Sequence, residues 1–224
     1  MSIRDNLNEI KGRIARSAEK AGRNPQDVRL VAVSKVQPEE RIIEALEAGH
    51  RLYGENRVQE AQMRWSESGF RDQYPDLTLH LIGPLQTNKV KDAVSLFDVI
   101  ETVDREKLAK TLAKEMEKQS RSLPCFIQVN TGEEEQKAGI LPSALSEFYE
   151  FCVQECGLNI IGLMCIPPVD DPPALHFAFL KKLADKLGLK ELSMGMSSDY
   201  EWAVAHGASY VRVGTGVFGA RDYS

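Results

Sequence analysis

Lys35 is the first residue in this sequence whose type and position suggest chemistry. It ends the segment "RLVAVSK", residues 29–35, so an amine follows an apolar run that is suited to burial. Side chains alternate along a strand, which places Val31, Val33 and Lys35 on one face. If the two valines fill an interior, Lys35 rises above it, and lost hydration lowers its pKa toward the amine form that attacks carbonyls. The alternative is a solvated lysine that forms a salt bridge.

Two turns near the other end of the chain have the composition of a phosphate-binding site. A glycine lets the backbone approach a ligand, and small hydroxyl residues can begin a helix whose free N–H groups bind an anion. The first turn, "GMSSD", contains Gly195, Met196, Ser197, Ser198 and Asp199. The second, "RVGTG", offers further donors at Gly214, Thr215 and Gly216. Either turn alone is weak evidence, but together they favour phosphate binding.

Arg212 lies immediately before the second turn. An arginine in a binding site can donate a hydrogen bond to an aromatic ring nitrogen, and an ion pair with Asp or Glu is the simpler alternative. An amine, a phosphate site and this arginine together suggest pyridoxal 5'-phosphate (PLP) held as a Schiff base.

The elements that must position these residues alternate between strand and helix. Apolar patterns predict an amphipathic helix over residues 3–22, with Ile3, Leu7, Ile10 and Ile14 on one face, and then eight strands. The strands are expected at 30–34, 51–53, 79–82, 97–101, 125–130, 159–164, 191–194 and 209–213. Helical patterns separate them at 38–49, 57–68, 88–97, 104–119, 142–155, 173–188 and 197–207.

This alternation predicts an α/β fold, a (β/α)8 TIM barrel with an extra N-terminal helix, as a single domain over residues 1–224. An open doubly wound sheet is the structural alternative. In such a barrel the site lies at the C-terminal ends of the strands, with phosphate often bound after strands seven and eight. Both glycine-containing turns occupy those positions.

Composition limits the classes of function. The net charge is -5 without a basic stripe, so we expect no nucleic-acid partner. No apolar run reaches the length of a membrane span and no signal sequence is recognisable, so we expect a cytoplasmic protein without membrane association. The cysteines, Cys125, Cys152, Cys156 and Cys165, are expected to be free thiols, and no histidine near them suggests a metal site.

Six motifs carry a resemblance that spans about residues 29–221. They are "AVSKVQP", "YGENRVQE", "HLIGPLQTNK", "VNTGEEEQKAG", "GLMCIPP" and "LSMGMSSDYEWAVAHGASYVRVGTGVFG". Together they closely resemble the pyridoxal phosphate homeostasis proteins of the YggS/PROSC type, which are related to the N-terminal barrel of alanine racemase. Their order and joint occurrence make this resemblance specific.

The resemblance implies a role for each candidate residue. Lys35 would form the Schiff base, and Asn56 would lie near the cofactor ring. Met196 and Ser197, together with Gly214 and Thr215, would hold the phosphate. Arg212 would face the pyridine nitrogen, and an arginine there leaves that nitrogen unprotonated and weakens the cofactor as an electron sink.

A departure from alanine racemase argues against efficient catalysis. Racemases of that fold use a tyrosine from a second domain, and this chain ends at Ser224 with only a terminal Tyr223, which we expect to be frayed. We therefore expect a monomeric protein of intracellular PLP homeostasis rather than an enzyme, with amino acids or apo PLP-enzymes as further partners. The alternatives are a PLP-dependent amino-acid racemase or isomerase and a Schiff-base aldolase, the latter leaving Arg212 unexplained. We interpret residues 132–139 as a solvated loop tip, although Lys137 is placed to approach a substrate carboxylate.

Overall fold

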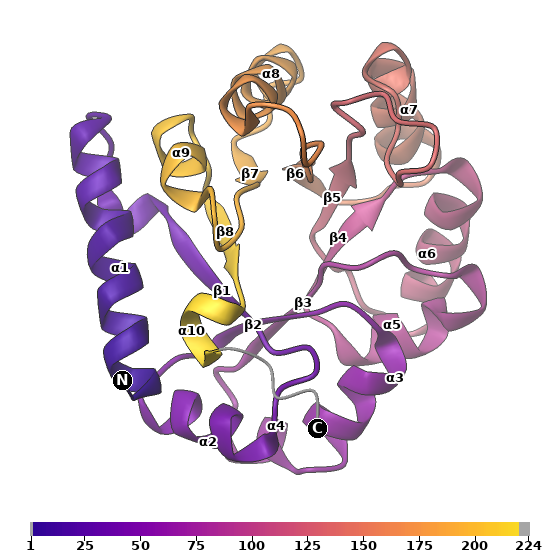
Figure 1. Cartoon of the computed structure of the whole chain (residues 1–224). Coiled ribbons are helices and arrows are strands. Elements are labelled where there is room, and N and C mark those ends of the chain that lie inside the picture. The colour runs from indigo at the N-terminus through magenta and orange to yellow at the C-terminus, as the bar shows by residue number, and fades with distance from the viewer. Residues whose placement is uncertain (1, 220–224) are drawn as a thin grey trace.

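Eight short parallel strands pair in chain order, and the last pairs with the first, in the computed structural model, which describes residues 2–219 (Figure 1). The strands are β1 (Arg29–Val33), β2 (Leu52–Glu55), β3 (Thr78–Leu81), β4 (Val99–Val103), β5 (Cys125–Gln128), β6 (Ile160–Met164), β7 (Glu191–Ser193) and β8 (Tyr210–Val213). Val31 is in register with Arg212 of β8, and Val33 is in register with Gly54 of β2. The closed barrel is confirmed, and the open sheet is excluded.

Each predicted strand is present, but the fourth begins later than expected. Residues 97–101 were predicted, and β4 is Val99–Val103. Phe97 closes the preceding helix by donating its N–H to Ala93, and the Asp98 carboxylate accepts the N–H of Leu79 at 2.7 Å. Both residues therefore serve the turn into the strand, which their apolar and polar types alone do not reveal.

Helices surround the barrel. The α-helices are α1 (Ile3–Lys20), α2 (Glu39–Glu47), α3 (Val58–Ala61), α4 (Phe70–Gln73), α5 (Val90–Leu96), α6 (Glu106–Lys118), α7 (Leu145–Glu150), α8 (Pro173–Lys186), α9 (Tyr200–Ala205) and α10 (Thr215–Phe218). Short 3-10 segments are η1 (Pro25–Asp27), η3 (Thr87–Lys89) and η4 (Pro142–Ala144), and π-helical turns η2 (Gln62–Ser66) and η5 (Phe151–Glu155) extend α3 and α7. Each predicted helical segment contains a helix, and α4 is an addition.

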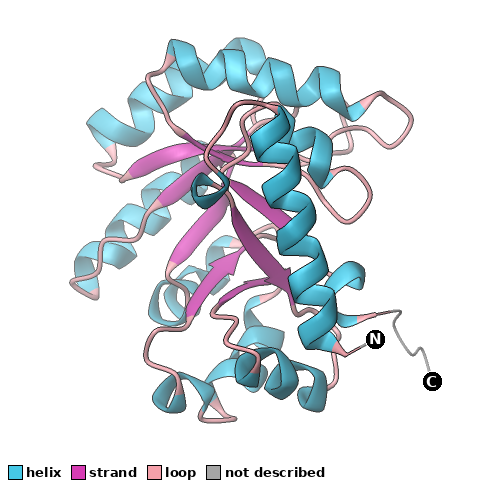
Figure 2. Cartoon of the chain, turned by 90° about the vertical axis from the view of Figure 1, so that its left-hand side faces the viewer, coloured by secondary structure: helices cyan, strands magenta, loops and turns pink. Residues whose placement is uncertain are grey.

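The N-terminal helix completes the helical ring. The element that follows β8, α10, has only four residues, and α1 packs beside α9, α10 and α2. A capping box at Ser2 and Asp5 begins α1, and the predicted apolar face is buried. Figure 2 shows α1 lying along the outside of the strands. It therefore occupies the place that a full eighth helix would otherwise fill.

Alternation along the strands separates two apolar cores. Val31, Val99, Phe126, Met164 and Tyr210 pack together inside the barrel. Leu30 and Ala32 belong instead to the larger core between strands and helices. The predicted inward direction of Val31 is thus confirmed. Within residues 2–219, no helix is long and apolar enough to cross a membrane.

Candidate functional site

Lys35 lies in a tight turn directly after β1. The N–H of Gln37 donates to the carbonyl of Ser34 at 3.2 Å, which closes the turn around Lys35 and Val36. Val36 has a φ of 58°, a left-handed conformation that is unfavourable for a β-branched residue. Lys35 is partly buried. Local strain next to the candidate amine is typical of a functional turn.

A buried carboxylate ties the base of this turn to the next strand. Ser34 donates its hydroxyl to Glu55 Oε1 at 2.7 Å, and Trp65 Nε1 and Arg64 donate to the same oxygen at 3.0 and 2.9 Å. Burial raises the pKa of the Glu55 carboxyl, and the charge of Arg64 opposes that shift. The ends of β1 and β2 are therefore joined outside the barrel, below Lys35.

Asn56 directly follows β2, the strand that pairs with β1. Val33 and Gly54 are in register, and Lys35 and Asn56 each follow their strand partner by two residues. Asn56 lines a cavity of about 580 Å³, together with Arg57 and Lys89. Asn56 thus contributes to a cavity with a basic lining at the strand end next to that of β1.

The turn after β7 depends on Gly195. Its φ is +92°, and an added Cβ would lie 2.5 Å from the Cβ of Ala203, so only glycine fits. The Asp199 carboxylate accepts the N–H of Met196 at 2.6 Å rather than capping a helix, and α9 begins one residue later at Tyr200. Ser197, Ser198 and Asp199 thus lead directly into α9, and Asp199 occupies the position before its first residue without a side-chain cap. Ser197 and Ser198 are exposed, in the turn before α9.

The turn after β8 lies against β1. A Cβ placed on Gly214 would be 3.5 Å from the Cβ of Val33. The carbonyl of Gly214 accepts the N–H groups of Val217 and Phe218 to form α10, and Thr215 is exposed. Within residues 2–219, the N–H groups of Ser197 and Thr215 have no hydrogen-bond acceptor. Two sets of donors therefore remain for a ligand at adjacent strand ends.

Arg212 is inside the barrel and only 3% exposed. Its guanidinium donates to Ser193 Oγ at 2.6 Å and to the carbonyl of Cys165 at 2.9 Å. Ser193 donates in turn to Glu101 Oε2 at 2.5 Å, and His80 Nδ1 lies 2.6 Å from Glu101 Oε1. Arg212 therefore does not pair directly with Glu101, as a simple ion pair would require. Ser193 connects the two side chains instead.

Neither Glu101 nor Ser193 stands out in the sequence, and a lone histidine at a strand end, such as His80, could be functional but is more often structural. All three are at most 1% exposed. Each interrupts an apolar strand at an inward position, in "LHL", "VIETV" and "ELS". These polar residues at inward positions of three different strands could have indicated a buried network, because buried polar groups require hydrogen-bond partners.

The loop over residues 132–139 is less solvated than predicted. Lys137 Nζ lies 2.7 Å from the Glu134 carboxylate and donates to the carbonyl of Pro167 at 3.3 Å. Both charged side chains are only about a third exposed or less. Glu133 and Glu135 do project into solvent. The solvated interpretation therefore holds for part of the acidic run and is wrong for its Glu134–Lys137 pair.

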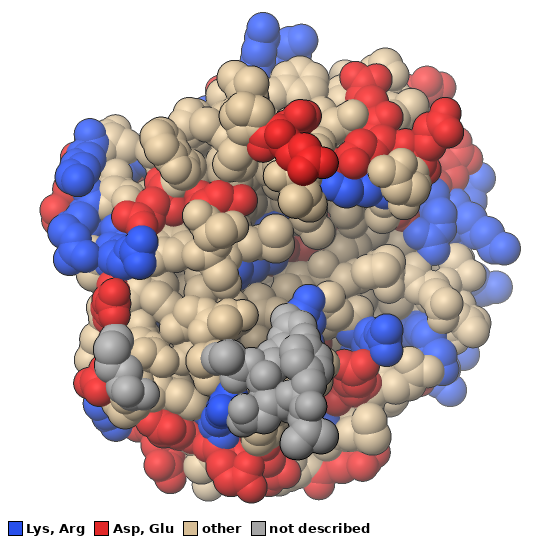
Figure 3. Space-filling model, viewed as in Figure 1, with Lys and Arg blue, Asp and Glu red and all other residues tan. Residues whose placement is uncertain are grey.

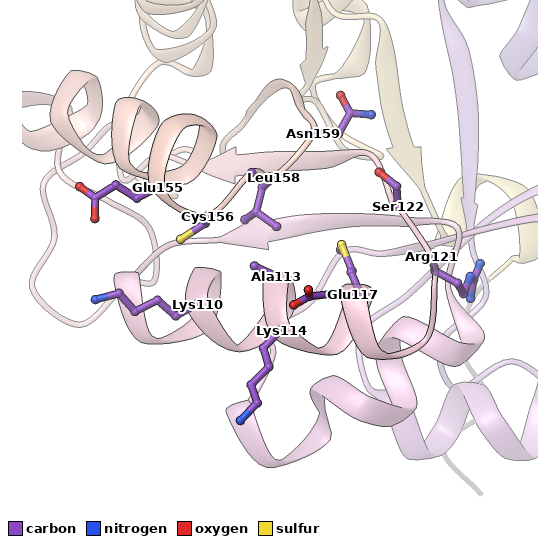
Figure 4. A pocket seen from close by; sticks show the side chains of 12 residues that line it. Lys110, Ala113, Lys114, Glu117, Arg121, Ser122, Glu155, Cys156, Leu158 and Asn159 are labelled. Atoms are coloured by element: carbon purple, nitrogen blue, oxygen red, sulfur yellow. The ribbon is translucent and has the colours of Figure 1, made fainter.

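A hollow lies at the centre of the face shown in Figure 3, and basic atoms are visible within it. A cavity of about 500 Å³ elsewhere is lined by Lys110, Arg121, Cys156 and Asn159 (Figure 4). Asn159 precedes β6, so this cavity lies toward the N-terminal ends of the strands, away from the site that a barrel uses. Burial also raises the pKa of the Cys156 thiol, which makes it a poor nucleophile.

The remaining thiols and potential ligands give no competing centre. All four cysteines are free. Among residues 2–219, no group of three or more His, Cys, Asp or Glu side chains is arranged to hold a metal ion. Tyr223, considered above as a second acid or base, lies outside the described residues.

All seven candidate positions lie at the C-terminal ends of four consecutive barrel strands, β7, β8, β1 and β2. A family model described as the alanine racemase N-terminal domain matches residues 5–222. A pyridoxal phosphate homeostasis protein of Vibrio cholerae is 42% identical over 100% of this chain and 98% of its own length. The chain belongs to the family of pyridoxal phosphate homeostasis proteins.

Solved structures agree with that assignment. PipY of Synechococcus elongatus, determined with PLP bound, is 38% identical, has a TM-score of 0.84, and is matched over 97% of this chain and 100% of its own. Alanine racemase of Clostridium difficile is 15% identical with a TM-score of 0.73, and the match covers 100% of this chain but 57% of that enzyme. The racemase shares the fold alone.

Proposed function

We propose that this protein binds PLP as a Schiff base on Lys35 and acts in intracellular PLP homeostasis without efficient catalytic turnover. The observation that carries the proposal is the convergence of an amine, two turns with unused N–H donors and a buried arginine at neighbouring strand ends. The relatives named for PLP homeostasis, and PipY with its bound PLP, support the same assignment.

The residues present fit this cofactor. The Lys35 amine would condense with the cofactor aldehyde to form a C=N bond and release water, and exchange with another amine would free Lys35 again. Ser197 and Thr215 offer backbone N–H groups to the phosphate, and Met196 and Gly214 shape the two turns that present them. Asn56, which directly follows β2, would lie near the ring.

Arg212 argues for storage rather than catalysis. When bound, PLP supplies an electron sink, whose strength depends on protonation of its ring nitrogen. A guanidinium keeps its proton at any physiological pH, so Arg212 would donate a hydrogen bond to that nitrogen without protonating it. The site would then retain the aldehyde but stabilise carbanions poorly.

The wider role follows from reversible binding. Amino acids and apo PLP-enzymes are the partners that would draw the cofactor away, and nucleic acid and membranes are not expected partners. We infer a cytoplasmic location, because four free thiols suit a reducing compartment. We also infer a monomer, which size-exclusion chromatography with light scattering would check.

Absorbance and borohydride labelling test the assignment directly. The purified protein should be yellow, and reduction should fix the pyridoxyl mass on the peptide that contains Lys35. Lys35→Ala should abolish this labelling and leave the fold intact. Lys35→Arg is the matched control, because it keeps the positive charge but cannot form the Schiff base. A colourless wild-type protein that gains no mass when incubated with PLP would refute the proposal.

Proton exchange separates homeostasis from the alternative, a PLP-dependent racemase or isomerase. The holoprotein would be incubated with L-amino acids in deuterated water, and loss of the α-proton signal would be followed. We expect exchange far slower than the roughly 1 per second or more that is typical of enzymes. Exchange at an enzymatic rate would assign the protein to catalysis instead.

A further inference from the structure

A chain of hydrogen bonds crosses the barrel interior below the candidate site. It connects His80 of β3, Glu101 of β4, Ser193 of β7 and Arg212 of β8. Each side chain is at most 3% exposed. The proposed function uses only Arg212, so the other three are buried polar groups that still need an explanation.

The direction of each hydrogen bond follows from the inventory of donors. A guanidinium can only donate, so Ser193 Oγ accepts from Arg212. The single hydroxyl proton of Ser193 then remains for Glu101 Oε2. Glu101 must accept at that oxygen, which suits an ionised carboxylate.

The surroundings of Glu101 favour that ionised form. Burial raises the pKa of the Glu101 carboxyl, but the hydrogen bond and charge of His80, the charge of Arg212 and the hydrogen bond from Ser193 outweigh it and hold the pKa below its ordinary value. Charge-assisted hydrogen bonds of this kind are short and directional. The arrangement is therefore rigid as well as buried.

The guanidinium is consequently held from two sides. Ser193 takes one N–H and the Cys165 carbonyl takes another, so three of the five N–H donors of Arg212 remain for other partners. An arginine side chain has many rotamers, and leaving one side unanchored would let the guanidinium turn away. What fixes Ser193 therefore also fixes Arg212.

We propose that Glu101, held by His80 and acting through Ser193, is the positioning residue that orients Arg212 toward the bound ring. The proposal rests on the proposed function, because it takes the ring nitrogen as the target of Arg212. Glu101 itself does not touch the cofactor.

A serine pair provides the matched test. Ser193→Ala breaks the link between Glu101 and Arg212. The control, Ser209→Ala, removes another buried hydroxyl, which forms hydrogen bonds with the backbone of Leu192; Ser209 directly precedes β8. We expect Ser193→Ala to raise the PLP dissociation constant about tenfold, as loss of a charge-assisted hydrogen bond predicts. At saturating PLP it should also shift the visible absorption band. Ser209→Ala should change neither quantity.

Glu101→Gln tests whether the two residues act as one unit. It should weaken binding in the same direction, and the double variant with Ser193→Ala should bind no more weakly than Ser193→Ala alone. Urea unfolding would confirm that each variant is folded. If Glu101→Gln does not fold, the comparison of Ser193→Ala with Ser209→Ala is sufficient to test the proposal.

Two outcomes would overturn the inference. One is a folded Ser193→Ala protein with unchanged affinity and spectrum, and the other is a fully additive double variant. Borohydride labelling of Lys35 in the wild type keeps the two proposals apart. If Lys35 is labelled but Ser193→Ala has no effect, only the inference about Glu101 fails, whereas an unlabelled wild type refutes the proposed function itself.

Discussion

At the scale of single residues, the turn that carries Lys35 stores strain in Val36. This valine has a φ of 58° and is 58% exposed, so it has little packing to offset its left-handed conformation. Asparagine tolerates the same φ much better because it lacks a branched Cβ. The strain therefore belongs to one side chain and is removable.

Val36→Asn should raise the free energy of unfolding by about 1 kcal/mol, measured by urea denaturation. Val169→Asn is the matched control, because Val169 is 92% exposed and is not among the residues with positive φ. It should be close to neutral. Equal effects of the two substitutions would show that strain at residue 36 does not limit stability.

At the scale of elements, α1 braces the side of the site that holds the predicted phosphate turns. Asn6 donates from Nδ2 to the carbonyl of Val217 in α10 at 2.9 Å, and Arg13 forms an ion pair with Glu201 of α9. A Cβ on Gly216 would lie 3.3 Å from the Cδ1 of Ile10. The position of α10 thus depends on a helix about 200 residues earlier in the chain.

Two isoleucines of α1 allow this role to be tested. Ile10 and Ile3 are each 5% exposed. Ile3 is the control because it begins α1 and its backbone N–H donates to Glu44 of α2, not to α10. Either substitution by alanine should cost about 2–4 kcal/mol in unfolding free energy. Only Ile10→Ala should also weaken PLP binding, measured by titration under conditions where both variants are folded. Equal affinities of the two variants would argue against bracing.

At the scale of the whole molecule, His50 makes stability depend on pH. It is buried near the start of β2, with Nε2 2.7 Å from the carbonyl of Leu52. Burial, helped by the nearby charges of Lys11 and Arg51 and opposed by the hydrogen bond to Leu52, lowers the pKa of His50 from 6.5 to about 4. Between those values the unfolded chain binds a proton that the folded protein does not. Stability from this group is therefore complete above pH 6.5 and decreases as the pH falls toward 4.

Acidification from pH 7.5 to pH 5 should lower the unfolding free energy by about 2 kcal/mol through His50. His50→Gln should remove that share of the pH dependence, because glutamine keeps an N–H donor but does not titrate. Urea unfolding of both proteins at the two pH values gives the difference. Parallel pH dependence in the two proteins would show that folding does not lower the pKa of His50.

Much of the barrel was predictable because its signals are local. Apolar alternation located each strand, and the same alternation assigned Val31 to the interior and Leu30 to the outer core. The predicted start of β4 was wrong because Phe97, an aromatic residue typical of strands, ends a helix instead. The side-chain partner of Asp199 could not be predicted either, since its carboxylate accepts the N–H of Met196 and does not cap the helix that follows it.

The sequence by itself determined which residues stand at the strand ends, because the period of two, the turn glycines and the order of elements all act over a few neighbouring residues. It therefore indicated Lys35 and the two glycine-containing turns. Only the tertiary structure decided what lies beneath Arg212. Residues 80, 101, 193 and 212 meet because the barrel closes, and closure sets which inward side chains face each other. No local pattern carries that information, since it depends on the tilt and register of all eight strands together.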